Sequence, residues 1–79
     1  MQPMGTIHKT GKFTIRVNGF EHPPVHAHVL HTDGKAIVYL DGTVINSGVP
    51  AAVMAQAKRW LSANRAVVTV EWNKCNPKA

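Results

Sequence analysis

Apolar and polar residues alternate with a period of two through the first half of the chain. Between residues 12 and 18, Phe13, Ile15 and Val17 alternate with polar side chains, which is typical of a half-buried strand. Similar runs predict further short strands over residues 6–9, 25–30, 35–40 and 43–46. Turn-forming residues separate these runs, most clearly Asp41-Gly42, a pair that favours a type I′ hairpin. The pattern therefore predicts a small antiparallel β-meander of four or five strands.

The second half of the chain changes to the spacing of a helix. Over residues 51–63, apolar residues recur at intervals of three and four, and we expect that face to pack on the sheet. The predicted buried face consists of Val53, Ala57, Trp60 and Leu61. A long amphipathic helix is therefore expected after the meander.

A second, shorter helix is expected over residues 65–72, with Asn64 as its N-cap. The β-branched run from Val67 to Val70 favours a strand by propensity alone, so this segment leaves both alternatives open. Val68 and Trp72 lie one helical turn apart, which favours the helix and places Trp72 in the core. Together these elements predict an α+β fold.

Length and composition indicate one small globular domain over residues 1–79, with flexible ends at residues 1–5 and 76–79. The hydrophobic content of 44% is too high for a disordered chain. Cys75 is the only cysteine, which excludes an internal disulfide and favours a cytoplasmic location. No apolar run approaches the ~20 residues that span a bilayer, and no signal-peptide layout is present, so no membrane association is expected.

Histidines gather in the segment from residue 21 to residue 28. His26 and His28 lie two residues apart on a predicted strand, so both imidazoles project from one face. His22 lies in the proline loop before that strand and can fold back toward the same face. Three converging imidazoles could bind Zn²⁺, Ni²⁺ or Cu²⁺, whereas Glu21 is interpreted as a solvated charge or a residue that orients a ligand. The alternative is a polar strand face that binds no metal.

Several short motifs follow one another in a fixed order along the chain: Glu21-His22, Pro23-Pro24, His26-Ala27-His28, Asp33-Gly34-Lys35-Ala36, Leu40-Asp41-Gly42, Trp60, Asn64-Arg65 and Glu71-Trp72. In this order they resemble the domain of unknown function 4160 family of small bacterial proteins. The resemblance covers the chain from about Met4 to Asn76. The chain departs from the family pattern at Val25, which separates Pro24 from His26 where many members place proline directly before that histidine.

This resemblance implies a small sheet packed by C-terminal helices, and it supports a helix over residues 65–72. Family genes often lie beside a gene for another small protein, in an arrangement similar to toxin–antitoxin pairs. The resemblance therefore implies a protein partner encoded nearby, but it assigns no biochemical activity.

Three hypotheses about function follow from these features. In the first, the chain is a non-catalytic binding protein: its net charge of +5, from nine Lys and Arg against four Asp and Glu, favours RNA, and the family resemblance implies a protein partner. In a ribonuclease alternative, His26 and His28 are the general acid and base, and Arg16 or Lys12 binds the phosphate. In a metal-binding alternative, His22, His26 and His28 hold a transition metal ion such as zinc. The histidine segment is the predicted site in the last two hypotheses.

Overall fold

The computed structural model describes residues 4–19 and 21–76, which form a five-stranded antiparallel sheet followed by two helices. The strands lie in the order β1-β2-β3-β4-β5, with bounds β1 (Met4–Lys9), β2 (Thr14–Asn18), β3 (His26–His31), β4 (Gly34–Tyr39) and β5 (Val44–Ser47). Each expected strand is present, and its bounds differ from the predicted ones by one or two residues. The predicted meander and the α+β class are therefore confirmed.

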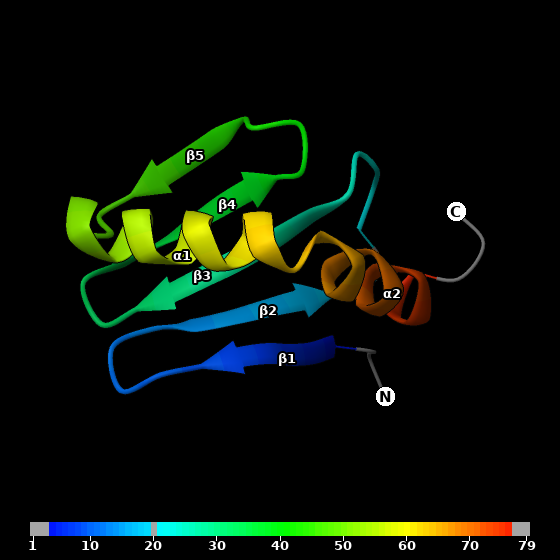
Figure 1. Ribbon diagram of the computed structural model, residues 1–79, viewed down its shortest axis with the longest axis horizontal. Helices are drawn as coiled ribbons and strands as arrows, with labels where there is room; N and C mark the ends of the chain where they lie inside the picture. The colour runs from blue at the N-terminus through cyan, green and yellow to red at the C-terminus, as the bar shows by residue number, and fades with distance from the viewer. Residues whose placement is uncertain (1–3, 20, 77–79) are drawn as a thin grey trace.

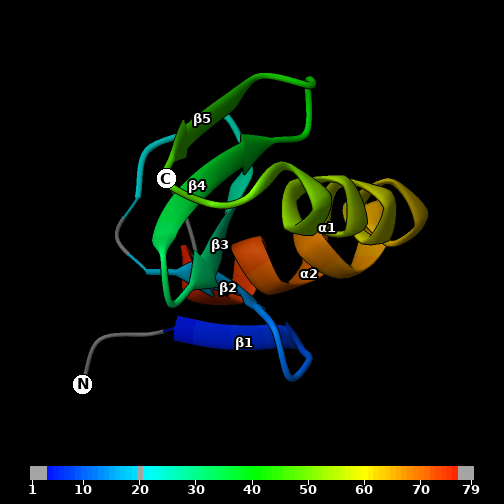
Figure 2. The same ribbon diagram turned by 90° about the vertical axis from the view of Figure 1, so that its left-hand side faces the viewer.

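The two helices are α1 (Ala51–Ala63) and α2 (Arg65–Cys75). Figure 1 shows α1 crossing over the sheet, and α2 packed where β2 ends and β3 begins. In Figure 2, α1 lies on one side of the sheet only. Residues 65–72, for which the sequence allowed either a helix or a strand, are helical. Burial decides the conformation, because the helix buries Val68 and Trp72 and leaves Val67 and Val70 exposed.

The core lies between the sheet and the helices. Phe13, Ile15 and Val17 are buried, as the alternation predicts. Other strands and both helices complete the core with Ala27, Val29, Ala36, Val38, Val49, Val53, Met54, Ala57, Leu61, Val68, Trp72 and Cys75. Because successive strand residues point to opposite faces, the intervening residues line a second face that α1 does not cover (Figure 2). We call this second face the open face.

The prediction that Trp60 lies in the buried face of α1 is wrong. Trp60 is only partly buried, and its ring stacks on the ring of His8 in β1, with centroids 4.6 Å apart. Met54 instead joins Val53, Ala57 and Leu61 on the buried face of the helix. Trp60 therefore covers the margin between α1 and the edge strand.

Both ends of the chain take a larger part in the fold than the sequence predicts. Met4 and Gly5, expected to be flexible, belong to β1. Asn76, expected to be part of a frayed tail, is buried and hydrogen bonded. The remaining residues of the predicted flexible ends, 1–3 and 77–79, lie outside the described residues. Neither α1 nor α2 is long and apolar enough to cross a membrane.

Candidate functional site

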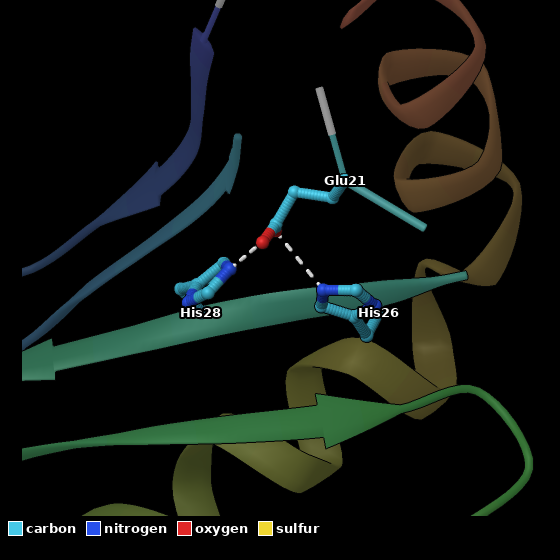
Figure 3. Close-up of side chains that lie close together, drawn as sticks. All are labelled: Glu21, His26 and His28. Atoms are coloured by element: carbon cyan, nitrogen blue, oxygen red, sulfur yellow. Dashed lines mark hydrogen bonds and ion pairs between the residues drawn. The ribbon is translucent and has the colours of Figure 1, made fainter. Parts of the chain in front are cut away.

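A carboxylate and two imidazoles converge where the chain passes from β2 into β3. His26 begins β3 and His28 follows two residues later, so both rings project opposite to the buried Ala27 and Val29. Figure 3 shows Glu21 reaching from the segment before β3 toward both rings. We call Glu21, His26 and His28 the EHH cluster. One nitrogen or oxygen atom from each of these residues lies within 4.8 Å of the other two.

One carboxylate oxygen is shared between the two histidines. Glu21 Oε1 lies 3.0 Å from Nε2 of His26 and 2.6 Å from Nε2 of His28. The two imidazole rings meet edge to face, with centroids 5.4 Å apart. These atoms therefore surround one small volume rather than forming separate pairs.

The backbone fixes the orientation and the tautomer of His26. Its Nδ1 lies 2.8 Å from the carbonyl oxygen of Pro24, and a carbonyl only accepts hydrogen bonds, so Nδ1 carries the proton. The rings of Tyr39 and Trp72 pack on the same imidazole, with centroids 4.8 and 4.9 Å away. In a neutral His26, Nε2 then presents a lone pair toward the carboxylate. The lone pair and the negatively charged carboxylate oxygen repel each other. A proton or a metal ion between Nε2 and Glu21 Oε1 removes this repulsion.

The two histidines favour the ionised form of Glu21. Its partial burial would raise the pKa, but the hydrogen bonds and positive charge of His28 and His26 outweigh burial and lower the pKa below its ordinary value. The carboxylate is therefore ionised at neutral pH and attracts a proton or a cation.

The segment that carries Glu21 is anchored by the end of α2. The backbone N–H of Glu21 donates to Oδ1 of Asn76 at 2.7 Å, and Nδ2 of Asn76 donates to the carbonyl of Asn18 at 3.0 Å. One buried amide side chain thus connects the end of β2, the start of the connecting segment and the C-terminus of α2. This anchor fixes the backbone from which the Glu21 side chain extends.

The structure brings together two of the three histidines proposed as ligands. His26 and His28 belong to the EHH cluster, whereas the exposed His22 does not, and Glu21 supplies the third group. Of the two interpretations of Glu21, the solvated charge disagrees with its hydrogen bonds to both histidines, whereas a residue that orients a ligand stays a prediction. Glu21 is partly buried and His22 is exposed, although the two are neighbours in a segment without regular secondary structure.

The two predicted phosphate-binding residues have different positions relative to the cluster. Arg16 of β2 pairs directly with His28 of β3, so its side chain projects from the open face beside the EHH cluster. Lys12 is exposed in the turn between β1 and β2, where its backbone N–H donates to Oγ1 of Thr10. Only Arg16 of the two therefore neighbours the cluster.

Cys75 has a structural position. Its side chain is buried, and Sγ lies 3.8 Å from the carbonyl oxygen of Val17 and 3.6 Å from Oε2 of Glu71. Burial, together with the hydrogen bond and the negative charge of Glu71, raises the pKa of the thiol. A thiol held in its protonated form is a weak nucleophile.

The fold and the cluster define a small α+β protein with a histidine–carboxylate site at one end of its sheet. Residues 12–73 match the model of the family described as Domain of unknown function (DUF4160), and the chain belongs to this family. No curated protein and no solved structure matches the chain. The family description assigns no activity, so the geometry of the site has to support any functional conclusion.

Proposed function

We propose that this chain is a metal-binding protein and that Glu21, His26 and His28 hold a transition metal ion such as Zn²⁺. The observation that carries the proposal is the orientation of His26. Its Nδ1 donates to a backbone carbonyl while its Nε2 faces a carboxylate oxygen. Histidines that bind metals usually donate their second ring N–H to a carbonyl or carboxylate in this way, which frees the other nitrogen for the metal.

The spacing of the three groups suits a metal ion. Zinc lies about 2.0–2.2 Å from nitrogen and oxygen ligands, and the three candidate atoms already lie within 4.8 Å of one another. Small rotations of the side chains are enough to bring all three into contact with one ion. Two neutral imidazoles and one carboxylate are also ligands that zinc and other divalent transition metals prefer.

The ribonuclease alternative has less support from this geometry. A general acid or base must reach the reacting group of its substrate through a ring nitrogen. His26 is 5% exposed, and both of its ring nitrogens already have partners in the protein. A role in binding RNA, or a partner protein in a toxin–antitoxin pair, stays a prediction that no contact among the described residues favours over metal binding.

Isothermal titration of the metal-free protein with zinc tests the proposal. We expect one zinc site with a sub-micromolar dissociation constant. The affinity for zinc should be at least about tenfold lower in His28→Gln and in Glu21→Gln. His22→Gln is the matched control, because it removes a neighbouring imidazole that lies outside the EHH cluster. Equal losses in all three variants, or millimolar binding by the parent, would overturn the proposal.

A further inference from the structure

We propose that the open face beside His28 binds a small organic anion with an apolar body, whose anionic group occupies a free coordination position of the metal ion. This inference rests on the proposed function, because it requires a metal ion in the EHH cluster. It adds the chemical class of a ligand that the cluster and the neighbouring strand residues would recognise together.

A shallow groove begins at the cluster. It is lined by His28, Lys35, Ala36, Ile37, Ile45 and Ser47, and it holds about 200 Å³ of free volume. Two cross-strand rows build it, because Ile37 of β4 pairs with both His28 and Ile45, and Lys35 pairs with Ser47. Directly paired side chains are close neighbours on one face of a sheet, so Ile37 lies beside the imidazole of His28, and Ile45 lies beside Ile37.

The apolar side chains of the groove are accessible to a ligand. The side chain of Ile45 in the edge strand β5 is 54% exposed, although it stands beside Ile37. An apolar ligand body on these two side chains would remove apolar surface from water, which is favourable. The groove is smaller than the about 300–1,000 Å³ of sites for drug-sized ligands, so the ligand must be small.

Positive charge exceeds negative charge at the metal-loaded site. A zinc ion brings two positive charges, of which the single carboxylate of Glu21 neutralises one, since the imidazole ligands are neutral. Lys35 adds a positive charge at the groove. The excess of positive charge favours an anion.

The EHH cluster leaves a metal ion one coordination position for an external ligand. A site with three protein ligands keeps a fourth position for water or an external ligand. His28 both belongs to the cluster and lines the groove, and its side chain is 17% exposed. A ligand that occupies the fourth position and also reaches the groove has to pass over His28 toward Ile37 and Ile45.

Titration with benzoate tests the inference, with benzyl alcohol as an uncharged molecule of similar shape and acetate as an anion without the apolar body. Each titration is carried out on zinc-saturated and on zinc-free protein. We expect benzoate to bind the zinc-saturated protein at least about tenfold more tightly than the zinc-free protein, and more tightly than either comparison compound.

Ile45→Ser and Val70→Ser form a matched pair of variants, because Val70 is 56% exposed on α2 and is not part of the groove. We expect Ile45→Ser to weaken benzoate binding about fivefold at zinc saturation, and Val70→Ser to leave it unchanged. Benzoate binding that is independent of zinc, or equal in the two variants, would overturn the inference and leave the metal site standing. If the zinc titration itself shows no site, the proposed function fails and the inference fails with it.

Discussion

Asn76 accepts a hydrogen bond at 2.7 Å from the backbone N–H of Glu21, a residue 55 positions earlier in the sequence. The same side chain donates to the carbonyl of Asn18, so it holds both the end of β2 and the segment that follows. The last residue that the structure describes thus sets the backbone position of the only carboxylate in the EHH cluster. Folding of α2 and assembly of the candidate metal site are therefore coupled.

Asn76→Ala should weaken both stability and metal binding. The substitution removes the partners of a backbone N–H and a backbone carbonyl, and leaving such groups unsatisfied costs about 1–3 kcal/mol each when they are buried. Urea unfolding and zinc titration measure the two effects. Asn73→Ala is the control, because Asn73 is an exposed residue of the same helix. Equal behaviour of the two variants would contradict the anchoring role of Asn76.

Acid should remove the stabilisation that Glu21 provides. The pKa of Glu21 is lower in the folded protein than in the unfolded chain, so its charge stabilises the fold above about pH 4.3, the ordinary pKa of a glutamate. This stabilisation is lost as the pH falls through the lowered pKa of the folded state. Urea unfolding of metal-free protein should therefore show the parent to be more stable than Glu21→Gln at neutral pH. That advantage should shrink in acid, and an advantage that stays constant or grows would be inconsistent with the lowered pKa.

The two tryptophans should differ in their contribution to stability. Trp72 is 4% exposed and packs on His26, so Trp72→Ala should cost about 3–5 kcal/mol, a large part of the stability of so small a domain. Trp60 is only partly buried and contacts His8 at the sheet margin, so Trp60→Ala should cost less. Thermal unfolding of both variants measures the difference. The reverse order would mean that the core is assigned to the wrong face of one of the helices.

Zinc binding should weaken in acid, because protons and the metal ion compete for the ring nitrogens of His26 and His28 and for the carboxylate of Glu21. Calorimetric titration with zinc at several pH values measures the change in the dissociation constant. An affinity that does not fall as the pH falls would contradict a site made of imidazole and carboxylate ligands.

The sequence predicts the contacts that depend on local periodicity, and it misses those between distant residues. Strand alternation alone places His26 and His28 on one face, where the fold has them. The same reasoning cannot place Asn76, because its partners lie 55 and 58 residues away and no local pattern marks them. His22 and Glu21 are neighbours in an irregular segment, where no period decides which one points inward. The helical pattern misplaces Trp60 because this residue lies at the edge of the apolar stripe, where the position of β1 determines burial.

Histidine ring NMR during a zinc titration tests the central claim most directly. At about one equivalent of zinc, the ring signals of His26 and His28 should shift together, and the Nδ1–H of His26 that donates to Pro24 should persist. The rings outside the EHH cluster should keep their signals; these belong to His8, His22 and His31. Shifts that appear only at millimolar zinc and spread over all five histidines would contradict a metal site at Glu21, His26 and His28.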